Sequence, residues 1–263
     1  MSNKRILYSN VLDSPGVVVT PSSEDPINRM FYAYDRDIGM PAAFANAASC
    51  SLIIDQSAVG GLLFDRLIIA GHNFDGMGLI LASSPDGIDW SAVLDSWTQV
   101  GSDTAQPGQN LINRTQPLAG QPYNFIGLFW SGNGGTIPTM TEVFIGLTYE
   151  MERNPSYGNQ VRATRDGVKV TDLHGGTEVY YDHWAGLQKR YRLWPLDRAV
   201  EAQAANINAL DLAWAGKMPF FVEDDYPADT PAWFFARMMK RADEAAKGLS
   251  YSAYTIEVLE VLP

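Results

Sequence analysis

Cysteine is almost absent from the chain, and this scarcity limits how the fold is stabilised. Cys50 is the single cysteine among 263 residues. One thiol cannot form a disulfide within its own chain, so cross-links are excluded as a source of stability. We expect a protein that folds in a cytosol and is held together by its hydrophobic core, with Cys50 as a small buried side chain.

Positive charge is also scarce. The chain has 19 Lys and Arg residues against 30 Asp and Glu residues, which gives a formal net charge of -11 and an isoelectric point near 4.6. No cluster of basic residues stands out along the chain. Nucleic acids and anionic membranes attract basic surfaces, so the charge argues against both as the main partner.

Long hydrophobic runs are missing as well. The first residues, MSNKR, are polar and are not followed by an extended apolar segment. We therefore expect neither a signal peptide nor a transmembrane helix, and no insertion into a membrane. What the chain does have is 46% hydrophobic and 11% aromatic residues, enough to build a sizeable core in one large or two ordinary domains.

The most informative stretch covers residues 62–90, LLFDRLIIAGHNFDGMGLILASSPDGIDW. Its first apolar run, residues 63–69, is too short for a typical helix and rich in residues that favour strands. Gly and Asn in residues 70–73 favour a tight turn, and a second turn is expected at residues 75–78. Residues 79–81 resume a strand before the strong turn signal Ser-Pro-Asp-Gly at 84–87. The pattern predicts two strands and three turns.

This order of strand, GHN turn, strand and DG-x-x-W turn resembles the discoidin or galactose-binding jelly roll, in the version found in bacteriophage tail proteins. The resemblance extends over about residues 30–149. It implies a mainly β fold, in which residues 51–55 open the sandwich, residues 123–131 form a strand and residues 141–149 form the closing strand. Between these strands lies a polar segment of about twenty residues, 101–121, which we expect to be a loop that becomes ordered against a partner.

A second domain is expected after a linker. Residues 152–160 contain Asn, Pro, Ser and Gly, so we place domains at residues 1–151 and 161–263. The second domain is predicted to be β-rich, with one clear helix near residues 198–215, where Asp197 is a suitable N-cap and Gly216 a suitable terminator. Its strand candidates are residues 168–173, 177–181, 188–193, 218–222 and 254–262; residues 232–239 fit either a helix or a strand.

The layout of residues 166–263 is similar to a tail-tip domain of siphophage-type tails. This second resemblance implies a viral structural protein of the virion, a component of the tail tip or baseplate that assembles in the bacterial cytoplasm. In such an assembly the chain forms a homo-oligomeric ring and contacts other tail proteins, namely the tube, the hub and the tape measure.

Five residues are candidates for binding a ligand at loop ends. His72, Asn73 and Asp75 belong to the GHN turn, and Asp86 and Trp90 belong to the DG-x-x-W turn. As ligand residues, those of the GHN turn would contact a sugar or a metal ion, and the DG-x-x-W turn would contact a ligand through its tryptophan. The simpler interpretation is structural: short polar side chains stabilise turns by bonding neighbouring backbone groups, and a tryptophan closes a hairpin by packing over it.

No catalytic set is apparent. His174 and His183, with Asp172 and Asp182, form the one close His/Asp group, but a Gly-Gly turn lies between them and they lack the ligand count of a zinc site. We therefore predict no metal, no cofactor and no enzymatic activity. A hydrolase acting on cell-wall material is the weakest of three hypotheses.

The first functional hypothesis is a structural component of a phage or prophage tail tip that links the tail tube to distal proteins. The alternative is a carbohydrate-binding module that attaches to a glycan on the host surface. The two are compatible, since tails present such modules toward the host.

Overall fold

The computed structural model describes residues 5–36, 39–101, 111–115, 123–150, 160–171, 178–197, 218–224, 232–238, 243–246 and 251–260. The chain divides into two compact units. The sandwich unit comprises Arg5–Tyr149 and Glu223–Phe234, and the second unit comprises mainly Glu150–Val222 and Phe235–Leu262. Each unit is described below by itself.

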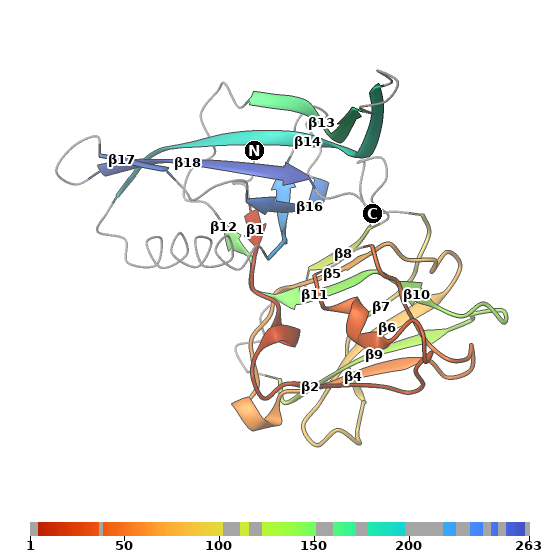
Figure 1. Cartoon of the computed structure of the whole chain (residues 1–263). Coiled ribbons are helices and arrows are strands. Elements are labelled where there is room, and N and C mark those ends of the chain that lie inside the picture. The colour runs from red at the N-terminus through yellow and green to blue at the C-terminus, as the bar shows by residue number, and fades with distance from the viewer. Residues whose placement is uncertain are drawn as a thin grey trace. The chain divides into compact units, whose positions relative to one another are not determined.

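Two antiparallel sheets form the sandwich unit (Figure 1). One has five strands in the order β2-β4-β9-β6-β7, and the other has three in the order β11-β5-β8. The five-stranded sheet comprises β2 (Val18–Pro21), β4 (Ser51–Asp55), β9 (Phe125–Ser131), β6 (Gly78–Ser84) and β7 (Ala92–Thr98). The three-stranded sheet comprises β11 (Glu142–Gly146), β5 (Arg66–Ala70) and β8 (Leu111–Thr115). The short strands β3 (Ala42–Ala43) and β10 (Thr139–Met140) pair with each other.

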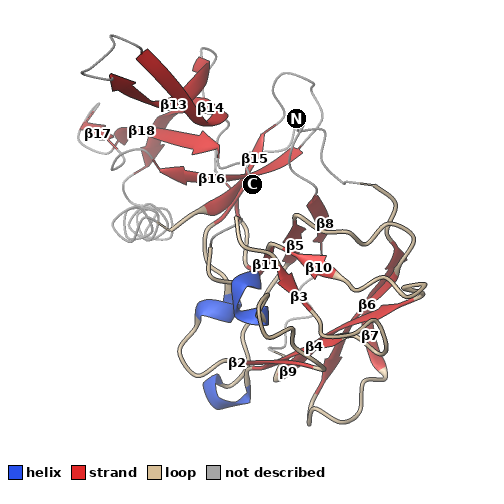
Figure 2. Cartoon of the chain, turned by 45° about the vertical axis from the view of Figure 1, so that its right-hand side comes forward, coloured by secondary structure: helices blue, strands red, loops and turns tan. Residues whose placement is uncertain are grey.

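Helical structure in the described residues of this unit is limited to three short 3-10 segments (Figure 2). They are η1 (Val11–Asp13), η2 (Met30–Ala33) and η3 (Ser57–Val59), and the remaining short strands are β1 (Arg5–Leu7) and β12 (Tyr149–Glu150). The prediction of a mainly β, jelly-roll-type sandwich is confirmed. No helix in the described part of the chain is long and apolar enough to cross a membrane.

Strand β9 shows how the sequence builds the core of the sandwich. In this strand Ile126, Leu128 and Trp130 belong to the buried core cluster, while Phe125 and Phe129 are only partly buried. Successive side chains of a strand point to opposite faces, so one face of β9 lines the core and the other faces outward. The Trp130 ring meets Phe44 and Phe74 edge-on, with centroids 5.2 and 5.5 Å away, which fills the centre of the sandwich.

The two strands of residues 62–90 lie where the sequence predicted them, and they belong to different sheets, β5 to the three-stranded sheet and β6 to the five-stranded one. β4 occupies residues 51–55 as expected, and residues 62–90 contain β5, the GHN turn, β6 and the following turn. The apolar run at 63–69 begins its strand only at Arg66, which is buried and donates from Nη1 to Asn113 Oδ1 at 2.8 Å.

The prediction of a continuous loop over residues 101–121 is wrong. Leu111–Thr115 forms β8, which pairs along the whole of β5, from Arg66 opposite Thr115 to Ala70 opposite Leu111. The segment is polar in composition, but Leu111 and Ile112 are buried against the core. An edge position beside β5 therefore overrides the local preference for a loop.

The second unit contains long antiparallel strands. β14 (Glu178–Asp197) pairs with β13 (Gln160–Thr171) on one side and with β18 (Tyr251–Glu260) on the other. β18 also pairs with β17 (Asp243–Ala246) and with the end of β16 (Ala232–Met238), and β15 spans Phe220–Asp224. The strand candidates at 177–181 and 188–193 are predicted as separate strands, but Glu178–Asp197 is one continuous strand. Within residues 232–239, which fitted either type, Ala232–Met238 forms a strand.

Two predictions for this half fall outside the described residues. The helix near 198–215 lies there entirely, and so does the linker at 152–160 apart from Gln160, which begins β13. The predicted domain boundaries stay a prediction.

Asn10 joins the chain's first segment to the sandwich. Its side chain is 4% exposed, donates from Nδ2 to the Val143 carbonyl at 2.9 Å, and accepts at Oδ1 from the N–H groups of Ile145 (3.0 Å) and Leu12 (3.3 Å). One amide thus bonds the backbone of β11 twice and caps η1.

We expect Asn10→Ala to lower the free energy of unfolding by about 2–3 kcal/mol, because it leaves buried backbone groups unpaired. Asn46→Ala is the matched control: Asn46 is exposed and its side-chain Oδ1 accepts from the nearby Ala48 N–H, so loss of the side chain is expected to change stability by about 0.5 kcal/mol or less. Urea unfolding of both variants measures the difference, and equal effects would contradict the anchoring role.

Candidate functional site

The GHN turn is a structural clamp in the sandwich unit. Asn73 donates from Nδ2 to the Ile137 carbonyl at 3.0 Å and accepts at Oδ1 from the Thr139 N–H at 2.8 Å. His72 is 5% exposed; its Nδ1 accepts from the Phe74 N–H at 3.2 Å, and its ring stacks on that of Phe74. These contacts hold the turn between β5 and β6 against the start of β10.

Asp75 closes the next part of the same connection. Its Oδ1 accepts from the Gly101 N–H at 2.6 Å and so joins the β5–β6 turn to the end of β7. All three polar candidates of the GHN turn therefore bond to the protein itself, as turn chemistry predicts.

Asp86 organises the second turn. Its Oδ1 accepts from the N–H groups of Ile88 (2.9 Å) and Asp89 (3.0 Å) and from the Ser84 hydroxyl (3.0 Å). These bonds to the ionised form lower the pKa of the Asp86 carboxyl, the backbone N–H of Asp89 contributing most. The carboxylate thereby stabilises the turn that precedes Trp90.

The structure does not bring the five predicted residues into one site. His72, Asn73 and Asp75 precede β6, whereas Asp86 and Trp90 follow it. A seven-residue strand spans about 20 Å, so the two turns lie at opposite ends of the strand. A single ligand the size of one sugar cannot contact both groups.

Trp90 returns from its turn to lie on the outer face of the five-stranded sheet. Its ring meets that of Phe129 at a centroid distance of 5.3 Å and an angle of 71°. Gly127 makes room for both rings, since a Cβ placed on it would lie 2.8 Å from the Trp90 ring and 2.5 Å from the Phe129 ring. Both aromatic side chains remain partly exposed.

The residues beside Phe129 on this face follow from strand register. Ser51 of β4 and Ile80 of β6 are its direct neighbours, and Ser96 of β7 lies opposite Ile80. A row of hydroxyl, aromatic, aliphatic and hydroxyl side chains therefore crosses the sheet. We call Trp90 and this row, Ser51, Phe129, Ile80 and Ser96, the outer-face patch.

Sequence reasoning identified Trp90 but missed Phe129 and Gly127. Alternation along residues 125–131 separates Gly127 and Phe129 from the core residues of the same strand, which is a signal that they share a face. It does not show which strands lie beside them, because that depends on pairing between segments far apart in the sequence.

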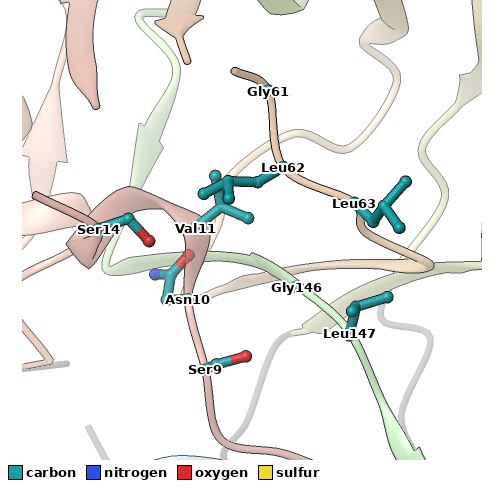
Figure 3. A pocket seen from close by; sticks show the side chains of 9 residues that line it. All are labelled: Ser9, Asn10, Val11, Ser14, Gly61, Leu62, Leu63, Gly146 and Leu147. Carbon is teal, nitrogen blue, oxygen red and sulfur yellow. The ribbon is translucent and has the colours of Figure 1, made fainter. Parts of the chain in front are cut away.

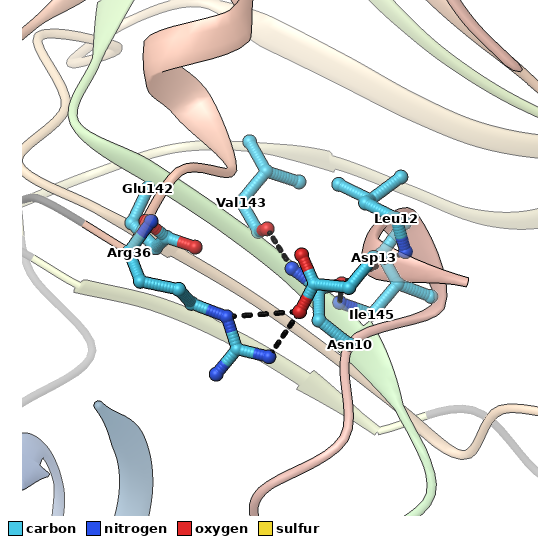
Figure 4. A network of polar contacts seen from close by, with 7 residues as sticks. All are labelled: Asn10, Leu12, Asp13, Arg36, Glu142, Val143 and Ile145. Carbon is cyan, nitrogen blue, oxygen red and sulfur yellow. Dashed lines mark hydrogen bonds and ion pairs between the residues drawn. The ribbon is translucent and has the colours of Figure 1, made fainter. Parts of the chain in front are cut away.

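A separate polar network surrounds Glu142 at the start of β11 (Figure 4). Glu142 is fully buried, and its Oε2 accepts from the Arg36 backbone N–H at 3.1 Å. The Arg36 side chain pairs with Asp13 and lies over the Phe144 ring, 4.1 Å from its centroid. Arg36 has a positive φ of 68°, a conformation that residues with a Cβ adopt rarely.

Burial raises the pKa of the Glu142 carboxyl well above 4.5, and the nearby carboxylates of Asp13 and Asp35 add to the rise, while the charge of Arg36 opposes it. The contacts of this network are made within the protein, between Glu142 and Arg36, Arg36 and Asp13, and Arg36 and Phe144. Among the described residues, no group of three or more His, Cys, Asp or Glu side chains is placed to hold a metal ion. His174 and Asp172 lie outside those residues, and Asp182 and His183 belong to strand β14.

The chain is similar to known proteins in structure but not in sequence. No protein-family model matches the sequence, and no curated protein matches it. Among solved structures, it is similar to the module CBM32-6 of the Clostridium perfringens protein CpGH89, with 11% identity, a TM-score of 0.40, and coverage of 54% of this chain and 99% of that one.

Two further similar structures are of the same kind. CBM32-5 of the same protein, solved in complex with GalNAc-β-1,3-galactose, has 14% identity, a TM-score of 0.39, and coverage of 49% of this chain and 94% of that one. A fucose-binding module of Streptococcus pneumoniae, SpX-3, has 13% identity, a TM-score of 0.38, and coverage of 52% and 96%. These structural neighbours are carbohydrate-binding modules.

The buried carboxyl gives a prediction about pH. With its pKa raised in the folded state, Glu142 keeps its proton where the unfolded chain has lost it. The folded state then binds more protons, so the free energy of unfolding falls as pH rises above about 4.5 and becomes level above the raised pKa. We expect Glu142→Gln to remove this fall. Urea unfolding of both proteins from pH 4.5 to 9 measures it, and an equally steep fall in the variant would contradict the assignment.

Proposed function

We propose that the sandwich unit binds carbohydrate and that the outer-face patch is its contact surface. The observation that carries the proposal is the partly exposed pair of Trp90 and Phe129, set over Gly127 on an open sheet face. Aromatic rings offer an apolar face to the C–H groups of a sugar, and neighbouring hydroxyls supply hydrogen bonds to its OH groups.

The surroundings of the pair suit such a ligand. Ser51 and Ser96 place hydroxyl groups on either side of the Phe129–Ile80 centre of the patch. The turn that delivers Trp90 is held rigid by the bonds of Asp86, so little conformational freedom is lost when a ligand binds. The resemblance of residues 30–149 to the galactose-binding jelly roll supports the same function.

The five predicted ligand residues have different roles in the proposed binding. Trp90 is the contact residue, and Asp86 positions it by shaping the turn. His72, Asn73 and Asp75 form the clamp at the opposite end of β6 and take no part in binding at the patch.

We expect the chain to bind at least one polysaccharide or glycan in affinity gel electrophoresis or on a glycan array, and Trp90→Ala to weaken that binding by about 10- to 100-fold. The loss corresponds to about 1.5–3 kcal/mol for one buried aromatic contact. Phe31→Ala is the matched control, because Phe31 is an aromatic side chain that is 54% exposed elsewhere on the sandwich unit. Circular dichroism checks that both variants fold.

Three outcomes would overturn the proposal: no glycan bound by the unaltered chain, full binding by Trp90→Ala, or an equal loss in Phe31→Ala. The same binding experiment, run on the unaltered chain and on both variants, distinguishes the three outcomes.

Assembly in a phage or prophage tail tip is a second candidate function. Its support is the resemblance of the layout of residues 166–263 to tail-tip domains. The antiparallel strands β13, β14 and β18 of the second unit are compatible with such a domain.

For that function we expect the full chain to form a closed ring in solution, since tail rings are built by rotational symmetry. Size-exclusion chromatography with light scattering should then give a mass several times the 28.9 kDa of one chain. A mass of one chain at all concentrations from about 1 to 100 µM would count against ring formation by this protein alone, and would leave glycan binding untouched.

A further inference from the structure

The sandwich unit has a concave site that is separate from the outer-face patch. It is an open pocket of about 480 Å³ (Figure 3). Three segments meet there: the chain after β1, the segment before β5, and the end of β11. The lining residues are Ser9, Asn10, Val11, Ser14, Gly61, Leu62, Leu63, Gly146 and Leu147.

One wall of the pocket is preformed. Asn10 is held by its three buried hydrogen bonds to η1 and β11. At Gly146 the backbone approaches so closely that a Cβ there would lie 2.1 Å from the Ser9 carbonyl oxygen. Because these contacts fix the two segments against each other, the wall does not need to form when a ligand arrives.

The lining is uncharged and aliphatic. None of its nine residues carries a charge or an aromatic ring. Leu63 and Leu147 stand at the opening, and they are 38% and 41% exposed. An ionised ligand would find no oppositely charged partner among these side chains.

Polar atoms are few. Asn10 is already bonded to the protein, so the side-chain groups left to a ligand are the hydroxyls of Ser9 and Ser14, which come from the same segment (Figure 3). A pocket of this volume falls within the range of small-molecule sites, which are mainly apolar and have a few polar groups that fix orientation.

We infer that this pocket binds a small uncharged aliphatic molecule whose one hydroxyl or carbonyl group faces Ser9 and Ser14. The branched side chains of Val11, Leu62, Leu63 and Leu147 supply the apolar contact. Burial of the ligand's alkyl part, together with release of water from the pocket, drives binding. The site differs from the outer-face patch in both its elements and its chemistry, so the two bind independently.

The test uses the full chain and the uncharged dye Nile red. We expect a saturable rise in its fluorescence with one dye per chain. Leu147→Asp places a charge at the opening and is expected to weaken binding at least tenfold, as is Leu63→Asp. Ile88→Asp is the matched control: Ile88 is 83% exposed at the turn after β6, and the same charge there is expected to leave dye binding unchanged.

Competition tests the ligand class. 1-Octanol is expected to displace the dye at a concentration at least tenfold lower than octanoate at pH 8, because the two share an alkyl chain but only octanoate is charged. Equal displacement by both would overturn the assignment of an uncharged ligand. Equal effects of the Leu147, Leu63 and Ile88 variants would overturn the assignment of the pocket.

Light scattering under the same conditions separates a third outcome. If the two leucine variants abolish self-association as well as dye binding, the pocket is an interface between copies of the chain, and the small-molecule proposal fails. Glycan binding by Leu147→Asp is expected to equal that of the unaltered chain, so failure here does not bear on the outer-face patch.

Discussion

The register of β9 between β4 and β6 is the constraint on which the sandwich unit depends. One face of β9 carries Ile126, Leu128 and Trp130 into the core, and the other carries Gly127 and Phe129 to the outer surface. A shift of pairing by one residue would exchange the two faces and expose the core residues. The same register that closes the core therefore creates the outer-face patch.

The polar side chains of the predicted ligand set make hydrogen bonds that hold connections of the sandwich unit in place. Asn73 bonds backbone groups at the start of β10, and Asp86 bonds backbone groups in the turn after β6. Asn10 bonds the backbone of β11. Without disulfides, the long connections of this unit are fixed by such bonds and by burial. The hydrogen bonds of Asp86 hold the turn before Trp90, and those of Asn10 hold the wall of the pocket. The same bonds that stabilise the fold therefore also position the two proposed binding sites.

The two proposed sites of the sandwich unit differ in their chemistry. The outer-face patch is aromatic and open, with hydroxyl neighbours, whereas the pocket beside Asn10 is aliphatic and concave. Neither carries a titratable side chain at its centre. A fully buried carboxyl lies elsewhere in the unit, at Glu142, where burial makes stability rather than binding depend on pH.

The sequence by itself determined the class of the fold and the two strands of residues 62–90, because short apolar runs bounded by Gly, Asn and Pro-Asp-Gly turns have few other solutions. It located β4, the GHN turn and Trp90. It did not reveal β8 inside a polar segment, the continuity of β14, or the pocket. Those depend on which strands become neighbours, and only the tertiary structure decided that: β8 is a strand because β5 offers it a free edge, and Trp90 meets Phe129 because Gly127 leaves room for both rings.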